Sequence, residues 1–374
     1  MNFEFTEEQD SIRTLARDIF EGEVTADRQR AAETSTDWMD LEVWTRLAEA
    51  NLLGLAVPEA QGGMGFGFVE LCVLLEEAGR QAIPLPLLET LVLGGLPLRE
   101  FGSEAQRERW LRPLAEGRTL LTGALSGVPG GGGGHAAPVS ARADGDAWVL
   151  EGTAREVPFA TRAERIVVAA ATPAGERLFL VDPRAPGASI SEETISTGQP
   201  LGTLHLSGVR CEPDASLGTA GEASWLRERL LVAAAALQLG VSSAALQLTA
   251  GYVREREQFG VPIGSFQAVQ HRAADAFIDL EALRWCTWRA AWRLAEGLPA
   301  AREAVVAKFW AADAGSRIAN ACIHLHGGIG SDVDYPIHRH FLISKSLELQ
   351  WGAATPHLVW LGRDMARTGP EELL

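Results

Sequence analysis

Cysteine is scarce in this sequence, and no two cysteines have the spacing of a metal site or a redox motif. The 374 residues contain four cysteines, none of them in a CxxC pair. They are Cys72, Cys211, Cys286 and Cys322. Isolated cysteines of this kind are typical of buried free thiols in a reducing compartment. We therefore expect neither disulfides nor a metal centre.

Basic residues are also fewer than acidic residues. The chain has 33 lysines and arginines against 49 acidic residues, which gives a formal net charge of −16. Nucleic acids and anionic membrane surfaces bind clustered basic side chains. This balance therefore argues against both as partners.

Targeting and membrane-spanning patterns are missing as well. The first residues, Met-Asn-Phe-Glu-Phe-Thr-Glu-Glu-Gln, contain neither the basic stretch nor the apolar run of a signal peptide. The Ala-rich stretch near Leu230 is interrupted by Gln238 and Ser242, so we expect no apolar run of membrane-spanning length. These absences favour a soluble, cytoplasmic protein.

The first part of the chain, residues 1–118, predicts an all-helical domain. Thr6-Glu-Glu-Gln9 has the form of a capping box, which begins a helix that runs to about Phe20. Further stretches of helical periodicity are separated by turns that contain glycine and proline. These helices are expected at Leu41–Ala50, Phe68–Gln81 and Glu104–Leu114.

The pattern changes in residues 119–222, where short runs of Val, Ile and Leu lie between turn signals such as Asp144-Gly-Asp. No helical period connects these runs, which predicts a small antiparallel β barrel or sandwich. The expected strands are Trp148–Leu150, Arg165–Ala169, Leu178–Val181 and Leu204–Val209. In residues 223–374 the helical period returns, which predicts a third, helical domain.

The stretch from Tyr252 to Asp275 predicts a helix end, a tight connection and a helix start. Gly260 supplies a left-handed cap, Pro262 prevents the helix from resuming, and Ser265 is a plausible N-cap for the next helix. Arg256 and Gln258 are therefore expected on the last helical turn, beside Phe259. A guanidinium matches the oxygens of a diphosphate bidentately, although an arginine lying over the surface of a helix bundle is an alternative.

This stretch closely resembles the Arg-x-Gln-Phe-Gly…Phe-Gln signature of flavin-dependent acyl-CoA dehydrogenases, and the resemblance covers nearly the whole chain. It implies a helix–barrel–helix fold that ends in a four-helix bundle, with FAD as the cofactor. In the family, the signature residues reach across a subunit interface to the pyrophosphate and adenosine end of the neighbour's FAD. The corresponding residues here are Arg256, Gln258, Phe259 and Gln267.

A second cofactor signature of the family, Gln-x-x-Gly-Gly-x-Gly, reads His324-Leu-His-Gly-Gly-Ile-Gly330 here. Gly327 and Gly328 would let the backbone approach the adenosine side of the cofactor closely, where a Cβ would obstruct it. The alternative is a plain helix stop at a double glycine. Together with the first signature, the resemblance favours a binding role for His324, Gly327 and Gly328.

The catalytic half of the family pattern is absent. The family reaction needs a carboxylate that removes the weakly acidic α-proton of an acyl-CoA. The position of the usual Glu is occupied by Trp351, followed by Gly352, and the position of the alternative Glu by Leu230. Glu348 and Glu228 lie nearby in sequence, but a small error in register redirects a side chain, so we assign no catalytic residue.

The two segments that bracket the isoalloxazine ring in active members are also replaced. One reads Leu125-Ser-Gly-Val-Pro before a run of glycines, and the other reads Arg155-Glu-Val-Pro-Phe-Ala. Neither retains the stacking Trp or the hydroxyl of the family pattern. The chain therefore resembles one that keeps the residues for a neighbour's flavin tail and loses those for its own flavin ring.

The resemblance is greatest to the base-less subunit of the α2β2 acyl-CoA dehydrogenases that actinobacteria use on sterol side chains. It implies a paralogous catalytic partner that supplies the Glu, the isoalloxazine pocket and most of the acyl-CoA site. Electron-transfer flavoprotein is the electron acceptor that this implies. Two alternatives stay open: a homomeric flavoprotein with other chemistry, such as flavin monooxygenation, and a scaffold or regulatory protein without enzymatic activity.

Overall fold

The computed structural model describes residues 4–125, 139–219 and 221–368, and the chain divides into two compact units. The first, here called the helical unit, consists of Met1–Ala26, Cys72–Ile83 and Leu231–Leu374. The second, called the sheet unit, consists of Asp27–Leu71 and Pro84–Leu230. Residues of the predicted N-terminal domain are thus found in both units.

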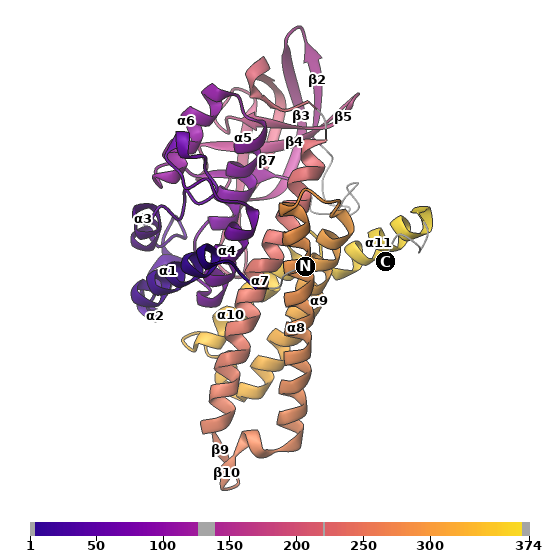
Figure 1. Ribbon diagram of the computed structural model, residues 1–374. Helices are drawn as coiled ribbons and strands as arrows, with labels where there is room; N and C mark the ends of the chain where they lie inside the picture. The colour runs from indigo at the N-terminus through magenta and orange to yellow at the C-terminus, as the bar shows by residue number, and fades with distance from the viewer. Residues whose placement is uncertain (1–3, 126–138, 220, 369–374) are drawn as a thin grey trace. The chain divides into compact units, whose positions relative to one another are not determined.

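The helical unit is built around the helices of the C-terminal part of the chain, α7 to α11. In Figure 1 the small hairpin of β9 (Glu257–Gln258) and β10 (Val261–Pro262) joins the ends of α7 and α8, and α9 packs along α8. Helices α10 and α11 both pack against α9. The elements are α1 (Glu7–Glu23), α7 (Glu222–Glu255), η5 (Ile263–Ser265), α8 (Gln267–Ala295), α9 (Ala301–His326), η6 (Gly327–Ser331), α10 (Pro336–Leu349) and α11 (Ala354–Thr368).

The predicted capping box at the start of α1 is confirmed. The backbone N–H of Gln9 donates to Thr6 Oγ1 at 3.2 Å, and the backbone N–H of Thr6 donates to Gln9 Oε1 at 3.0 Å. These two bonds satisfy amide groups that the first turn of a helix leaves without partners. Ile12, Ala16 and Phe20 then form the buried face of the helix.

Two glycines allow α4 (Phe68–Gln81) and α7 to approach each other closely within the helical unit. A Cβ added to Gly240 would lie 1.9 Å from the carbonyl oxygen of Glu76, and one added to Gly79 would lie 2.2 Å from that of Leu237. Both distances are far below van der Waals contact. The two helices therefore meet backbone to backbone, and any side chain at these positions would push them apart.

Helix α7 corrects one expectation about length. It has 34 residues, and among the described residues it is the helix that is long and apolar enough to cross a membrane. Gln238 and Ser242 do not interrupt it. However, 72% of its most apolar window is buried inside the protein, as in a core helix.

The sheet unit contains the predicted β domain, whose eight strands are arranged in the order β6-β7-β3-β2-β4-β5-β8, with β1 paired to β4. Most neighbouring strands are antiparallel, as predicted, but β1 runs parallel to β4, and β2 makes one parallel pairing with β4. The strands are β1 (Leu121–Ala124), β2 (Ser140–Asp144), β3 (Ala147–Pro158), β4 (Arg165–Thr172), β5 (Gly175–Val181), β6 (Ala188–Thr194), β7 (Pro200–Cys211) and β8 (Ser216–Leu217).

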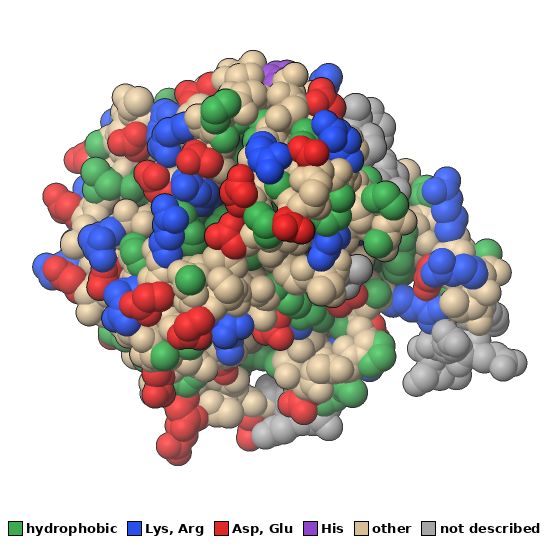
Figure 2. All heavy atoms as spheres, turned by 90° about the horizontal axis from the view of Figure 1, so that it is seen from above, with side chains coloured by type: hydrophobic (Ala, Val, Ile, Leu, Met, Phe, Trp, Pro, Cys, Tyr) green, Lys and Arg blue, Asp and Glu red, His purple; other side chains and the backbone are tan. Residues whose placement is uncertain are grey.

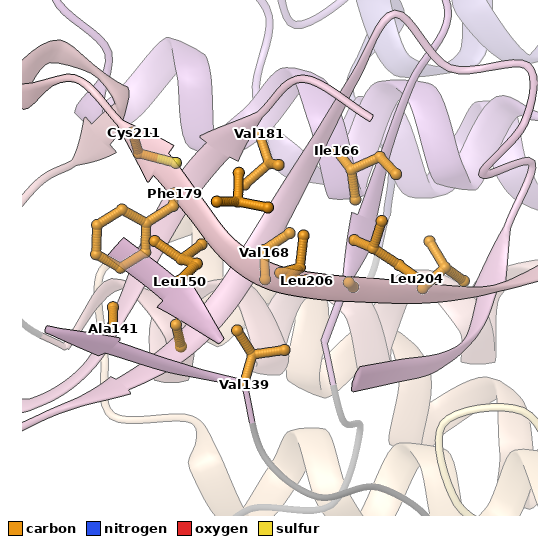
Figure 3. Close-up of a cluster of buried hydrophobic side chains, with 14 of the residues drawn as sticks. Val139, Ala141, Leu150, Ile166, Val168, Phe179, Val181, Leu204, Leu206 and Cys211 are labelled. Atoms are coloured by element: carbon orange, nitrogen blue, oxygen red, sulfur yellow. The ribbon is translucent and has the colours of Figure 1, made fainter. Parts of the chain in front are cut away.

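Side chains from several strands form the core of this sheet (Figure 3). Leu150, Val168 and Phe179 come from β3, β4 and β5, and all three are fully buried. Leu204 and Leu206 on β7 face the same cluster. Burial alternates from Leu204 to Ser207 and again from Val209 to Cys211, which is the period-two pattern of a half-buried strand.

The sheet unit also contains helices, and several of them were not predicted from the sequence. The predicted helices α3 and α6 are present, with bounds close to those expected. α2, the π-helix η2 and α5 were missed. The bounds are α2 (Ala26–Thr34), α3 (Leu41–Glu49), η1 (Glu59–Gln61), η2 (Leu88–Gly95), α5 (Leu96–Phe101), α6 (Glu104–Ala115) and η4 (Pro213–Ala215).

The charge balance of the sequence is visible on the surface. Figure 2 shows one face of the molecule, on which acidic and basic side chains are interspersed without a continuous basic area. Opposite charges mixed in this way partly cancel at a distance. This face thus lacks the clustered positive charge that binds nucleic acid.

A buried carboxyl group lies in the π-helix η2, whose eight residues are all buried. Glu89 Oε1 accepts a hydrogen bond of 2.9 Å from Gln199 Nε2. Burial raises the pKa of Glu89 to about 7, and the hydrogen bonds from its own backbone and from Gln199 only partly oppose that rise. The neighbouring Thr90 hydroxyl donates to the carbonyl of Leu121 at 3.1 Å, which ties η2 to β1.

Replacing Glu89 by Gln should remove a pH dependence of stability. Between the ordinary glutamate pKa of 4.5 and about 7, native Glu89 keeps a proton that the unfolded chain has released. The free energy of unfolding therefore falls as pH rises through this window, by up to about 3 kcal/mol. Urea unfolding at about pH 5 and about pH 8 should show this fall in the wild type and a smaller one in Glu89→Gln. An equal pH dependence in both proteins would contradict it.

Candidate functional site

The Arg256–Gly260 segment forms a hairpin rather than a last helical turn. Helix α7 ends at Glu255, and Val261 pairs with Gln258 across a two-residue turn. Phe259 and Gly260 both have positive φ, 58° and 79°, which is the pattern of a type I′ turn. Gly260 is left-handed as expected, but it belongs to the hairpin turn and does not cap α7, and the placement of Arg256 and Gln258 on the helix is wrong.

The predicted N-cap of the next helix is also wrong. Phe266 holds the N-cap position of α8 and makes no side-chain capping bond. The Ser265 hydroxyl instead donates to the carbonyl of Pro262 at 2.7 Å, within η5. A serine beside a helix start can therefore stabilise the preceding turn rather than the helix.

Phe259 is exposed and conformationally strained at the tip of this hairpin. Its side chain is 94% exposed, and a non-glycine residue with positive φ costs on the order of 1 kcal/mol. Its ring contacts only Phe266 among the aromatic residues described, in an edge-to-face arrangement at 6.2 Å. Neither burial nor backbone preference explains an aromatic residue at this position.

Arg256 follows α7 directly and is exposed. Its backbone N–H donates to the carbonyl of Tyr252 at 2.9 Å, and its carbonyl accepts from Ile263 at 2.8 Å. Within the described part of the chain, its guanidinium has no carboxylate partner. Gln258 and Gln267 are exposed as well. The hairpin therefore presents a fixed backbone with a free cation, two amides and an aromatic ring.

The double-glycine segment offers open space at its backbone. Helix α9 ends at His326, and Gly327 has a φ of 65°. A Cβ built on Gly327 or on Gly328 would meet no atom within 4 Å. His324, on the last turn of α9, is exposed. The surface here is thus accessible to a ligand that approaches the main chain.

A stack of aromatic rings joins these two segments. The ring of His326 lies over that of Tyr252 with centroids 4.5 Å apart and an interplanar angle of 24°, and Tyr335 meets His326 edge-on at 5.3 Å. Arg256 is one helical turn beyond Tyr252, and Gly327 follows His326. The structure thus brings together the hairpin and the double glycine that the sequence analysis identified separately.

His326 itself was missed as a candidate. Its Nδ1–H donates to the carbonyl of Cys322 at 2.8 Å, while Nε2 is buried and has no hydrogen-bond partner among the described residues. Burial lowers the pKa of His326, which favours the neutral ring. One feature of the sequence could have pointed to this region. The chain has only two tyrosines: Tyr252 lies shortly before the first predicted cofactor signature, and Tyr335 lies shortly after the second.

The two positions at which the resemblance predicts a base, Trp351 and Leu230, are apolar and differ in setting. Leu230 is fully buried in α7. Trp351 lies just after the end of α10, with a φ of 56°, and Gly352 follows with a φ of 99°. Trp351 is therefore not on a helix, and counting helical turns from Glu348 does not apply.

The nearby carboxylates have other partners. Glu348 is ion-paired with Lys345 on the same helix. Glu228 is half-buried next to Arg229, whose pKa is lowered to about 10 by burial, an effect that Glu228 opposes. Neither group is in the position of Trp351 or Leu230.

The segment that would face an isoalloxazine ring is part of the sheet core. Val157 and Phe159 are each 1% exposed, and the ring of Phe159 contacts that of Trp38 at 5.9 Å. The Thr122 hydroxyl donates to the carbonyl of Pro158 at 2.7 Å. The other segment, which begins at Leu125, continues into residues 126–138, which lie outside the described part of the chain.

Comparison with known proteins places the chain in a family. Residues 6–118 match the family pattern of the acyl-CoA dehydrogenase N-terminal domain, and residues 222–363 match that of the C-terminal domain. The chain belongs to the acyl-CoA dehydrogenase family. Acyl-CoA dehydrogenases are FAD-dependent oxidoreductases, and the helical and sheet architecture described above is the family fold.

Three similar acyl-CoA dehydrogenases are informative. Acyl-CoA dehydrogenase FadE27 of Mycobacterium tuberculosis is 38% identical, over 98% of this chain and 100% of its own. A chain in the crystal structure of the ChsE4-ChsE5 complex from Mycobacterium tuberculosis is 38% identical, with a TM-score of 0.92 over 98% of this chain and 100% of that one. A chain of a Tcur3481-Tcur3483 steroid ACAD variant is 44% identical, with a TM-score of 0.90 over 96% and 98%.

Replacing Phe259 by Asn should not destabilise the chain, and we expect a gain of about 0.5–1 kcal/mol in the free energy of unfolding. Asn-Gly is the preferred pair for a type I′ turn because Asn accepts positive φ readily. Chemical denaturation of the wild type and the variant would measure this gain. Phe259→Leu is the control, since it removes the ring but keeps the strained conformation. A marked loss of stability in Phe259→Asn would show that the ring supports the fold.

Proposed function

We propose that this chain is the non-catalytic subunit of a heteromeric FAD-dependent acyl-CoA dehydrogenase. In this proposal it lacks the base, and a paralogous catalytic subunit joins it in an α2β2 heterotetramer. The observation that carries the proposal is a contrast. The exposed hairpin and the open double glycine are retained, while both base positions hold the apolar residues Trp351 and Leu230.

The residues of the helical unit fit the tail of FAD. Arg256 is an exposed guanidinium without a carboxylate partner among the described residues, which suits the pyrophosphate. Phe259, Gln258 and Gln267 would contact the adenosine part. The backbone at Gly327 and Gly328 has room for the same end of the cofactor, next to His324. Each of these roles is proposed for this chain's residues toward FAD held mainly by the partner.

The chemistry then divides between the subunits. FAD, when bound, accepts the hydride that leaves the β-carbon of the acyl-CoA, while a carboxylate takes the α-proton. An indole at position 351 and a leucine at 230 accept no proton, so the carboxylate comes from the partner. The acyl-CoA would likewise be bound mainly by the partner. This chain contributes binding and orientation of the cofactor.

Relatives support the heteromeric form and the substrate class. Two of the similar structures bear the names of paired proteins, and one of these pairs is described as a steroid ACAD. We therefore propose a bulky steroid side-chain acyl-CoA as the substrate and electron-transfer flavoprotein as the electron acceptor, in the cytoplasm. We also propose the division into domains 1–118, 119–222 and 223–374, with the last building the oligomer.

The chain purified alone should not oxidise acyl-CoA, even when FAD is added in excess. The reason is that Trp351 and Leu230 provide no base. Flavin bleaching by a panel of acyl-CoAs under anaerobic conditions would measure this, beside flavin stoichiometry with and without the co-expressed partner. Bleaching by the homogeneous lone chain would contradict the proposal and favour a homomeric flavoprotein. Absence of flavin in the complex as well would favour a scaffold.

Replacing Arg256 by Ala should weaken FAD binding in the complex without dissociating it. The lost charge-assisted contact costs on the order of 2–4 kcal/mol, or a factor of roughly 30 to 1000 in affinity. Arg256→Lys should recover part of this, because it keeps the charge but not the fork. FAD retained per heterodimer after gel filtration would be measured beside the oligomer mass.

The matched control for this experiment is Arg254→Ala, which removes an exposed arginine two residues earlier. We expect it to leave FAD retention unchanged. Full FAD occupancy in Arg256→Ala would refute the role of Arg256 toward the pyrophosphate. Loss of the oligomer without loss of flavin would instead make Arg256 a structural residue.

A further inference from the structure

Lysine is nearly absent from this chain, and one of its lysines is completely buried. Of the 33 basic residues, two are lysines, Lys308 and Lys345, and the other 31 are arginines. Lys308 lies on α9 with an exposure of 0%. A buried cation is costly unless polar groups surround it, so its surroundings need an explanation.

Three backbone carbonyls surround the ammonium of Lys308. Its Nζ donates to the carbonyls of Gly352 at 2.8 Å, Leu347 at 3.1 Å and Glu348 at 3.3 Å. Two of these carbonyls belong to the last turn of α10, which leaves its final C=O groups without helical partners. The third lies beyond the helix end, in the turn that contains Trp351.

The geometry also accounts for the choice of lysine over arginine. An ammonium is a compact charge with three donors, and it fits three oxygens that converge on one point. A planar guanidinium directs its donors outward in a fork and fits that arrangement poorly. The end of a helix adds a favourable field for a cation. In a chain whose basic residues are nearly all arginines, the geometry at this position therefore favours lysine.

The turn that Lys308 holds is strained. Trp351 is in the left-handed region with a φ of 56°, a conformation that is unfavourable for a bulky residue. Its carbonyl accepts a hydrogen bond of 3.1 Å from the ring of His357, which is fully buried on α11. Both carbonyls of the Trp351–Gly352 turn are thus bound by buried side chains from neighbouring helices.

The electrostatic surroundings of Lys308 and His357 are consistent with these hydrogen bonds. Burial lowers the pKa of Lys308 to about 7, while the Glu348 carboxylate opposes the shift. The three carbonyl acceptors also favour the charged form. Burial and the nearby Lys308 lower the pKa of His357 to about 4, so its ring is neutral and donates one N–H to Trp351.

We propose that Lys308 is a positioning residue that, together with His357, holds the Trp351–Gly352 turn in its left-handed form and fixes the Trp351 indole in one place. The statement that the indole occupies the position of the family's base rests on the proposed function. The fixed indole then closes this chain's own base position to an acyl chain.

A double-mutant cycle on the full chain tests this inference. Lys308→Met removes the ammonium, and Trp351→Gly removes the residue for which positive φ is costly. If Lys308 holds the strained turn, Lys308→Met should lower the melting temperature less in the Trp351→Gly background than in the wild type. Equal decreases in both backgrounds would overturn the proposal. If Lys308→Met does not fold, His357→Phe takes its place in the cycle.

The position of the indole is followed separately by ¹⁹F NMR of 5-fluorotryptophan protein, with the Trp351 signal assigned from Trp351→Phe. Lys308→Met and Lys308→Arg should shift or broaden that signal. Lys345→Met, the control, changes the chain's other lysine, which is half-buried and pairs with the Glu348 carboxylate but donates to none of the carbonyls that hold Lys308, and should leave it unchanged. An unchanged Trp351 signal in folded Lys308→Met would overturn the role.

These readouts need neither flavin nor the partner, so they separate the two proposals. Acyl-CoA oxidation by the lone chain would refute the proposed function and leave the role of Lys308 intact. Additive effects in the cycle would refute the role of Lys308 and leave the proposed function intact.

Discussion

The contact between the rings of Tyr252 and His326 is the interaction on which the candidate cofactor site depends. It joins the end of α7 to the end of α9, two helices whose signature residues are about seventy positions apart in sequence. Each segment alone has an ordinary explanation, as a hairpin or as a helix stop. Placed together by the stack, a free guanidinium and an open stretch of backbone become one surface.

That surface is exposed, which distinguishes it from the buried polar groups described above. Glu89, Lys308 and His357 are buried and bound by the protein itself. Arg256 and Phe259 are exposed, and the backbone of Gly327 is open, so a ligand from outside the described chain can reach all three. An exposed aromatic residue in a strained turn is stable only because the hairpin around it is well determined, and such strain is typical of binding sites.

Much of the fold could be predicted from the sequence, because periodicity and capping are local. The Thr6–Gln9 capping box and the four predicted N-terminal helices were found in this way. Strands β2 and β6 were missed because most of their side chains are exposed and polar, so they lack the alternation that marks a half-buried strand. The parallel pairing of β1 with β4 is a long-range contact that no local pattern contains.

Part of the candidate site could also be identified from the sequence, because its motifs are local. The motif residues were identified from resemblance, but the turn at Phe259 was not, because sequence preference places positive φ at glycine and not at phenylalanine. Lys308 and His357 were missed because their partners are backbone carbonyls, which leave no trace in a sequence. A signal did exist for Lys308, which lies among the buried residues Ala304, Ala307 and Ala311 on the apolar face of α9.

The crossing of α4 and α7 has a consequence for how this protein can be altered by mutagenesis. Where two helices are separated by side chains, a random library can enlarge one residue and shrink its neighbour. At Gly79 and Gly240 the opposing atoms are main-chain oxygens, which no amino-acid substitution can make smaller. Selection for folded variants should therefore return glycine at both positions whatever the assay, and the pair would provide an internal calibration of how stringent such a screen is.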